Sequence, residues 1–395
     1  MNEDRKNIFQ DCLLDPDISF NNIKIKNNLV NENILLTGST GLLGAYLLSD
    51  LLKYTNANIF CIVRCKNEIE GFEKIKNNLN FYQLLQNNIS LNKRITVLKG
   101  DLSKPFIGLS QTHFDNLSEC IDVIYHNGCF VNFISPYSLL KKTNVFGTQN
   151  IIRLAATKYL KTINYISSVI IFFSEPYFNK GKVFENETPQ YDDTLQGGYK
   201  ISKWVSEKLI IKARESGVPV IIYRPTRIFG SIDTGIIPIE DALCHIVRTC
   251  IDMKMYPSLN TYMDFTPVDF LSKAIVNLSL RKKSLNKIFH LSNPVPISFK
   301  NFFKEISKCG YDLNETEYAF WISELKNMAK KNPDNKSYSY MIPFLEDNFN
   351  LIKRIMKFDS ENALEAISEL KLTYPEVNIK LIKTYMNYFK NQGII

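Results

Sequence analysis

A glycine-rich turn between a short apolar run and a longer amphipathic segment constrains this chain more than any other feature. The run Ile34–Leu36 predicts a buried strand, and the apolar spacing of Leu47–Leu52 predicts a helix after the turn. Glycines spaced three residues apart permit a tight turn, a close backbone approach to a pyrophosphate, and close packing of the helix on the strand. The helix start adds free N–H groups and a positive dipole. The predicted phosphate-binding residues are Gly38, Ser39, Thr40, Gly41, Leu42, Leu43 and Gly44.

Short apolar runs alternate with longer helical patterns along the chain. The predicted strands are Ile34–Leu36, Ile59–Val63, Ile95–Leu98, Val123–Tyr125, Ile163–Ile166 and Val220–Tyr223, with a late strand at Ile288–Leu291. The predicted helices are Ile69–Leu85, Tyr137–Tyr159 and Tyr199–Ser216. This alternation predicts an α/β fold with a Rossmann-type, doubly wound parallel sheet. A glycine motif alone could also mark a connector without function, and the downstream motifs argue against that alternative.

Composition excludes several classes of function. The chain has a net charge of +8, which suits acidic partners such as phosphates, coenzymes or acidic carrier proteins, or simply reflects an evenly solvated lysine surface. It has no long basic run or zinc-finger spacing, so we expect neither nucleic acid nor metal to bind. The most apolar window, Leu35–Leu52, contains polar residues and glycines, so we expect no membrane span. Scattered cysteines and a polar start favour a cytoplasmic location.

The end of the second predicted strand indicates the cofactor. An acidic residue there would bind the adenosine ribose of NAD, whereas this chain has Arg64. A guanidinium suits a 2′-phosphate, so the sequence predicts NADPH, with Lys74 as a second cation. The alternative is an ordinary exposed arginine at a strand end. Four further residues follow the third and fourth strands and are expected beside the cofactor: Asp101, Leu102, Asn127 and Gly128.

Tyr199 and Lys203 form a Y-x-x-x-K pair at the start of a strong helical pattern. Residues four apart share a helix face, so Lys203 is predicted to lower the pKa of Tyr199 and to reach the nicotinamide ribose. Tyr199 would then donate a proton to a carbonyl that receives a hydride. Ser167 and Ser168, at the end of the fifth strand, offer a hydroxyl to the same carbonyl oxygen. The spacing alone could also belong to an ordinary surface tyrosine and lysine.

The combination resembles the extended short-chain dehydrogenase/reductases. Further segments are similar to the thioester reductase family, the terminal reductase domains of nonribosomal peptide synthetases, polyketide synthases, carboxylic acid reductases and aminoadipate reductases. These segments are TGSTGLLG, CIVRC, GDLSKP, IDVIYHNGCFVNFISPY, LKKTNVFGTQNII, YISSV, GGYKISKWVSEKL, IYRPTRIFG and MDFTPVDF. The resemblance covers about Asn33–Asn293.

The resemblance implies roles for individual residues. Ser168, Tyr199 and Lys203 would be the catalytic triad, and Arg64 and Lys74 would hold the 2′-phosphate. The nicotinamide side would be lined by Asn127, Pro225 and Ile228, whereas Asn144 would brace the fold. The chain departs from the family pattern at Ser168, where threonine is usual, at Cys129, where alanine is usual, and at Thr226, where glycine is usual.

The predicted organisation has two lobes. The strand–helix alternation is missing from two segments, Pro238–Pro257 and Phe299–Ile395. We expect a polar lead-in at 1–30, an NADP-binding Rossmann domain at 31–235 to which 262–293 returns, and a smaller, mostly helical C-terminal substrate lobe at 236–261 and 294–395. The polar stretch Lys330–Lys336 is the strongest loop prediction.

The resemblance implies NADPH-dependent reductive release of an acyl thioester to an aldehyde, with further reduction to the alcohol as an alternative product. The thioester would be carried by a phosphopantetheinylated acyl or peptidyl carrier protein, or by coenzyme A as acyl-CoA. Alternatives are another extended reductase, such as a fatty acyl-CoA reductase or a sugar-nucleotide epimerase, and a non-catalytic NADP-sensing protein. No adenylation domain or carrier motif is found, so we expect either a stand-alone reductase or an excised domain, whose substrate arrives on another molecule.

Overall fold

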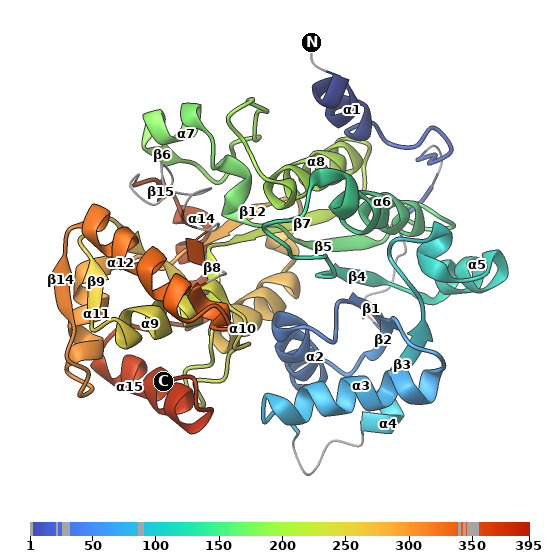
Figure 1. The fold of residues 1–395 in the computed structure, drawn as a ribbon. Helices are drawn as coiled ribbons and strands as arrows, with labels where there is room; N and C mark the ends of the chain where they lie inside the picture. The colour runs from blue at the N-terminus through green and yellow to red at the C-terminus, as the bar shows by residue number, and fades with distance from the viewer. Residues whose placement is uncertain are drawn as a thin grey trace.

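One parallel sheet forms the centre of the molecule. The structure is a computed structural model that describes residues 3–20, 23–25, 32–85, 91–338, 341, 342, 345 and 355–395. The sheet has seven strands (Figure 1). They are β1 (Asn33–Thr37), β2 (Asn58–Val63), β3 (Ile95–Lys99), β4 (Val123–His126), β5 (Thr162–Ile166), β7 (Val220–Pro225) and β12 (Ile288–Leu291). Every strand predicted from an apolar run is therefore confirmed.

The strand order is β12-β7-β5-β4-β1-β2-β3, so the winding reverses between β1 and β4. Leu36 in β1 lies opposite Cys61 of β2 and Tyr125 of β4. Parallel strands are buried on both faces, which is why they are near-continuous apolar runs in the sequence. In open α/β sheets, ligands bind outside the carboxyl ends of the strands at this kind of switch point.

Helices cover both faces of the sheet. One face packs against α2 (Leu42–Tyr54), α3 (Glu68–Phe81) and α10 (Val268–Ser279), and the other against α5 (Gln111–Cys120), α6 (Tyr137–Ala155) and α8 (Gly198–Glu215). Successive strand residues point to opposite faces, so Leu35 and Leu36 belong to different apolar cores. Short helical turns complete this half: α4 (Leu91–Arg94), α7 (Glu175–Lys180), η1 (Pro105–Gly108), η2 (Val169–Phe172) and η3 (Lys282–Ser284).

The C-terminal region is mostly helical, as predicted, and lies to one side of the sheet (Figure 1). Its helices are α9 (Ala242–Asp252), α11 (Phe299–Ser307), α12 (Tyr318–Lys331), α14 (Glu361–Glu369) and α15 (Ile379–Asn391). Three small strand pairs lie outside the seven-stranded sheet: β8 (Arg227–Phe229) with β11 (Phe265–Pro267), β9 (Met255–Pro257) with β14 (Asn314–Thr316), and β10 (Tyr262–Met263) with β13 (Ile297–Ser298). The predicted loop contains the non-helical residues 332–335.

Two elements that the predicted division assigns to the substrate lobe, a short strand and a helix, pack against the Rossmann half instead. β15 (Lys357–Phe358) pairs with β6 (Lys182–Val183), and α14 packs against β12. We retain the predicted division as a proposal, with residues 357–369 attached to the Rossmann half. Parts of the predicted lead-in and of the substrate lobe fall outside the described residues.

The polar lead-in contains a helix that sequence periodicity did not predict, α1 (Glu3–Asp11). Its Phe9 ring meets the Trp204 ring edge-on at 6.3 Å. Asp11 accepts a hydrogen bond from the Tyr137 hydroxyl at 2.7 Å and pairs with Lys141 at 2.6 Å. Contacts with α6 and α8, rather than an amphipathic pattern of its own, therefore hold α1 in place. Across the described segments, no helix is long and apolar enough to cross a membrane.

Candidate active site

The glycine turn is packed too tightly for side chains at two of its glycines. Gly38 has φ +74°, and a Cβ there would lie 2.7 Å from the Gly128 Cα. A Cβ on Gly44 would lie 1.9 Å from the Gly38 carbonyl oxygen. Packing therefore explains both of these glycines.

Packing within the protein does not explain Gly41. A Cβ there would meet only the Gly38 carbonyl oxygen, at an ordinary 3.6 Å, so the protein itself leaves room for a side chain. Gly41 is the N-cap of α2 and supplies no side chain to cap the first N–H groups of the helix. The residues present thus fit a dinucleotide whose pyrophosphate approaches the turn.

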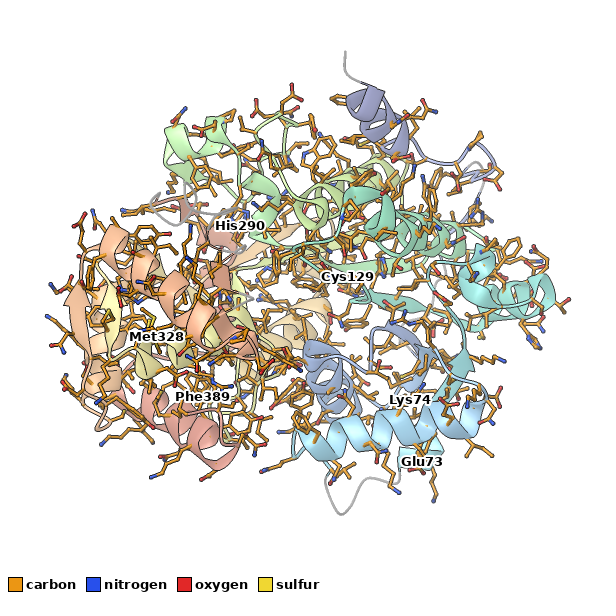
Figure 2. All side chains as sticks on the ribbon, in the orientation of Figure 1. Glu73, Lys74, Cys129, His290, Met328 and Phe389 are labelled. Carbon is orange, nitrogen blue, oxygen red and sulfur yellow. The ribbon has the colours of Figure 1, made fainter. Side chains whose placement is uncertain are left out.

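Arg64 follows β2 directly, and its side chain is exposed. Within the described residues, its guanidinium has no ion-pair or hydrogen-bond partner. Lys74 on α3 (Figure 2) is differently placed, because its ammonium donates to the Arg64 carbonyl oxygen at 2.8 Å and pairs with Glu70 at 2.7 Å. The two predicted phosphate ligands therefore lie together, but Glu70 already balances the charge of Lys74. Of the two cations, only Arg64 has no ionic partner among the residues that the structure describes.

The predicted residues after β4 lie against the glycine turn. The Gly128 N–H donates to the Thr37 hydroxyl at 2.8 Å, and the Asn127 amide donates to the Gly38 carbonyl at 3.4 Å. After β3, Leu102 is buried close to Gly128. The Asp101 carboxylate accepts from the backbone N–H of Ser103 at 2.9 Å and from its hydroxyl at 2.8 Å, so it shapes its own turn.

The start of α8 brings the predicted catalytic pair to the carboxyl end of β5. Lys203 is buried, and its ammonium donates to the Tyr165 hydroxyl at 3.0 Å and to the Ile166 carbonyl at 2.7 Å. Tyr199 is half-buried, and its ring meets the Phe133 ring edge-on at 5.1 Å. The main contacts of the Lys203 ammonium are therefore with β5 and not with the Tyr199 phenol.

The pKa of Tyr199 differs from the expectation that Lys203 lowers it. Burial raises the pKa of Tyr199 well above its usual value, and neighbouring Cys129 and Tyr165 raise it further. Burial also lowers the pKa of Lys203, against the opposing influence of Cys129 and Glu207. In this structure Tyr199 is therefore held in its protonated form, which is the form that can donate a proton.

The structure separates the two serines after β5. Ser167 is buried, and its hydroxyl donates to the Glu207 carboxylate. Ser168 is half-buried and caps η2, its oxygen accepting from the Ile170 N–H at 3.3 Å. The Ser168 hydroxyl hydrogen remains available to a ligand. Of the two, only Ser168 fits the predicted role.

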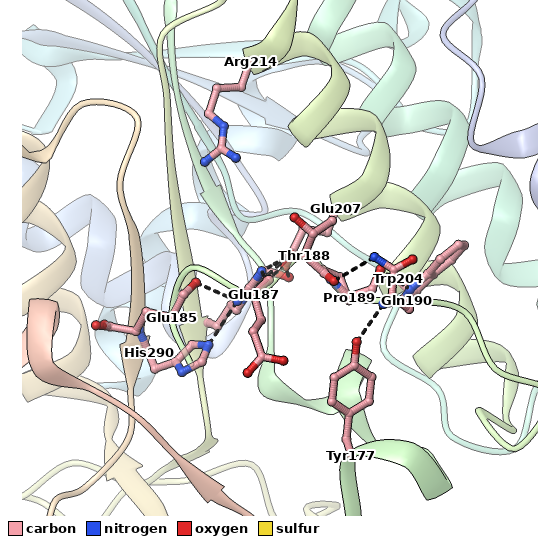
Figure 3. Close-up of polar contacts among 12 residues, drawn as sticks. Tyr177, Glu185, Glu187, Thr188, Pro189, Gln190, Trp204, Glu207, Arg214 and His290 are labelled. Carbon is pink, nitrogen blue, oxygen red and sulfur yellow. Dashed lines mark hydrogen bonds and ion pairs between the residues drawn. The ribbon is translucent and has the colours of Figure 1, made fainter. Parts of the chain in front are cut away.

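A buried ionic network that includes the Glu207 partner of Ser167 was missed by the sequence analysis, and Figure 3 shows its members Glu185, Glu207 and His290. Arg224 on β7 and Glu207 on α8 have fully buried side chains and pair at 2.6 Å. Arg224 also donates to the backbone carbonyl of Glu185 at 3.1 Å. The Glu185 carboxylate in turn accepts a hydrogen bond from the backbone N–H of His290 at 2.9 Å. The available signal was Arg224 at the end of the apolar run IIYRP and Glu207 among the apolar residues of KWVSEKLI.

The remaining predicted residues lie near the same strand ends. Pro225 is buried at the end of β7, and Ile228 is half-buried on β8. Asn144 is buried, accepts the Phe130 N–H at 2.7 Å and donates to the Ser202 hydroxyl at 2.9 Å, which is the bracing geometry expected of it. Among the described residues, no group of three or more His, Cys, Asp and Glu side chains could hold a metal ion.

Known proteins resemble this chain over most of its length. The model of the family described as male sterility protein, an NAD-binding family, matches residues 36–275. A linear gramicidin synthase of Brevibacillus parabrevis is 36% identical over 360 residues, which cover 91% of this chain and 7% of that protein. Glycine betaine reductase ATRR of Emericella nidulans is 33% identical over 322 residues, 79% of this chain and 25% of that protein. The chain thus spans a small part of these relatives.

Solved structures of reductase domains also resemble this chain. The terminal R domain from the myxalamid PKS-NRPS biosynthetic pathway superposes with a TM-score of 0.93 at 36% identity, covering 99% of this chain and 98% of that one. A thiolation-reductase di-domain from an archaeal nonribosomal peptide synthetase shares the fold, with a TM-score of 0.77 at 21% identity, covering 100% and 81% of the two chains. This chain belongs to the thioester reductase (R) domain family of nonribosomal peptide synthetases and PKS-NRPS hybrids, within the extended short-chain dehydrogenase/reductases.

Proposed function

We propose that this protein uses NADPH to reduce an acyl thioester and to release the acyl group as an aldehyde, with reduction to the alcohol as a second cycle. The observation that carries the proposal is the grouping of Ser168, Tyr199 and Lys203 at the carboxyl end of β5. That end adjoins the glycine turn. Cys129 lies beside Tyr199, and the residue before it, Gly128, packs on Gly38 of the turn.

Each catalytic side chain has a distinct task in this proposal. NADPH, when bound, supplies the hydride to the thioester carbonyl carbon. Ser168 donates a hydrogen bond to the carbonyl oxygen, and Tyr199 donates its proton to the same oxygen as negative charge develops there. Lys203 holds a positive charge near that proton transfer and offers its remaining N–H to the nicotinamide ribose. The resulting hemithioacetal loses the thiol through cleavage of its C–S bond, which leaves the aldehyde.

The preference for NADPH over NADH rests on Arg64, whose uncommitted guanidinium follows β2 where an acid would suit NAD. The proposed carrier of the thioester is a phosphopantetheine arm, either on an acyl or peptidyl carrier protein or in coenzyme A. The archaeal relative that joins a thiolation domain to its reductase supports the carrier protein. A cytoplasmic location is also proposed, and all eight cysteines are free thiols, as a reducing compartment would keep them.

The proposal is tested by mixing the purified protein with NADPH and a panel of acyl-CoA and acyl-carrier thioesters. NADPH oxidation, free thiol release and product mass are followed together, with Tyr199→Phe as the control. We expect NADPH loss, thiol and aldehyde in equal amounts for the first cycle, and one further NADPH for each aldehyde that is reduced to the alcohol. NADPH binding without turnover on any thioester would instead support a sensing role. Epimerisation of a nucleotide sugar in a parallel reaction, without reduction of any thioester, would support the epimerase alternative.

A further inference from the structure

An exposed apolar loop begins at the proposed active site. Four large apolar side chains within residues 130–134, here called the 130–134 loop, lie in solvent. Their exposed fractions are 44% for Phe130, 53% for Val131, 39% for Phe133 and 67% for Ile134. Single exposed apolar residues are common on proteins, but several on one short loop mark a binding surface.

The loop is held in a fixed shape, so its exposure is not the result of a loose backbone. Asn144 clamps Phe130 by accepting from its N–H at 2.7 Å and donating to its carbonyl at 3.0 Å. Asn132 accepts from the N–H groups of Ile134 at 3.0 Å and Ser135 at 2.7 Å. Beyond the loop, the backbone packs so closely on α8 that a Cβ on Gly198 would lie 2.4 Å from the Ser135 carbonyl oxygen.

The position of the loop connects it to the reacting carbonyl. Phe133 packs edge-on against the ring of Tyr199 at 5.1 Å, and Cys129, which precedes the loop, adjoins the Tyr199 hydroxyl. A group attached to a carbonyl at Tyr199 therefore starts beside Phe133, and the other apolar residues of the loop are next to Phe133 in the chain.

The chemistry of the loop selects an uncharged ligand. Residues 127–140 include no Lys, Arg, His, Asp or Glu. The next residue, Lys141, is paired with Asp11 at 2.6 Å. A charged acyl group would find no opposite charge here and would lose hydration against apolar side chains.

We propose that the 130–134 loop binds the acyl chain of the thioester and that this chain is apolar next to its carbonyl. The proposal rests on the proposed function. It commits the loop to the acyl chain rather than to the surface of a carrier protein, because the loop adjoins Tyr199 and carries no charge.

The test uses N-acetylcysteamine thioesters from butanoyl to decanoyl, which have neither a carrier protein nor a phosphate. The variant is Val131→Ser/Ile134→Ser, which keeps Phe133, whose ring packs against Tyr199. The matched control is Ile69→Ser/Val295→Ser, because these side chains are 78% and 72% exposed and lie outside the loop. We expect kcat/KM of the unmodified protein to rise with chain length. The loop variant should lose about ten-fold on decanoyl and less than about two-fold on butanoyl, while the control keeps the full dependence.

A binding measurement separates this inference from the proposed function. Calorimetry with a methyl ketone analogue of decanoyl thioester reports acyl binding without turnover, and the loop variant should bind it about ten-fold more weakly than the control. Equal chain-length dependence and equal binding in both variants would overturn the acyl site. A loss seen only with carrier-bound substrates would also overturn it, in favour of carrier docking. Loop-dependent binding by a protein that reduces no thioester would overturn the proposed function and leave the acyl site standing.

Discussion

Replacing Tyr165 with phenylalanine tests how the chain holds Lys203. Tyr165 is buried on β5, and its hydroxyl accepts a hydrogen bond from the Lys203 ammonium at 3.0 Å. The ammonium also lies over the Tyr165 ring, 4.5 Å from its centre. Tyr165→Phe removes the hydroxyl but keeps the ring and most of its packing. The change therefore isolates one hydrogen bond to a buried charge.

The expected magnitude follows from that contact. A hydrogen bond to a charged group contributes about 1.5–3 kcal/mol, equivalent to about 10- to 150-fold in rate or affinity. Because the Ile166 carbonyl still accepts from Lys203 at 2.7 Å and the ring remains, we expect the lower end, about ten-fold in turnover. The contact also predicts how the activity of the variant depends on pH. Burial already lowers the pKa of Lys203, and loss of a partner for the charged form lowers it further. Activity should therefore fall at a lower pH on the basic side than in the unmodified protein.

The assay is single-turnover NADPH oxidation with a thioester across pH, together with NADPH titration and denaturant unfolding. Tyr223→Phe is the matched control, because Tyr223 is a buried sheet tyrosine whose hydroxyl donates to Asn164 at 3.1 Å, away from Lys203. Both variants should lose similar stability, and only Tyr165→Phe should change the pH profile. Identical profiles and rates in the two variants would refute the positioning role of Tyr165.

Three further predictions concern the cofactor, the proton donor and stability. Arg64→Ala should weaken NADPH binding by about ten- to hundred-fold with little effect on NADH, measured by fluorescence titration; equal affinities in the unmodified protein would contradict the assignment. Tyr199→Phe should lower single-turnover reduction by about two to four orders of magnitude and leave NADPH affinity nearly unchanged, so an unmodified rate would exclude Tyr199 as the acid. Burial raises the pKa of Glu185 to about 7 from the ordinary 4.5, so the folded state binds the extra proton and stability should fall as pH rises through that interval. Glu185→Gln should flatten the fall in unfolding free energy between pH 4.5 and 7, and an unchanged slope would count against this origin.

The sheet was predictable because its signal is local. Each strand is buried on both faces, so an apolar run such as Ile34–Leu36 is sufficient to identify it. The glycine turn was predictable for the same reason, since the backbone conformation at Gly38 and the tight packing at Gly44 are requirements of one short segment. The spacing of Tyr199 and Lys203 on one helix was equally local. Their roles and those of the other predicted site residues stay predictions.

The parts that sequence reasoning missed depend on contacts between distant segments. Lys203 and Tyr165 are 38 positions apart, and only the packing of α8 on β5 brings them together. The lead-in helix α1 has little pattern of its own and is held by Tyr137 and Lys141. The choice between Ser167 and Ser168 likewise required the position of Glu207, which is 40 positions from Ser167. No periodicity records such pairings.

The buried pair Arg224 and Glu207 shows why such distant contacts matter for the site. A buried ion pair adds little net stability, because removing both charges from water costs about as much as their attraction returns. Its effect here is geometric: Glu207 also accepts from Ser167, so a residue of α8, a residue of β7 and the end of β5 are fixed to one another. Ser168 is the next residue, and Lys203 is one helical turn before Glu207. The pair therefore sets the spacing between Ser168 and Lys203. In the proposed reaction the thioester carbonyl, which accepts the hydride, must fit within that spacing.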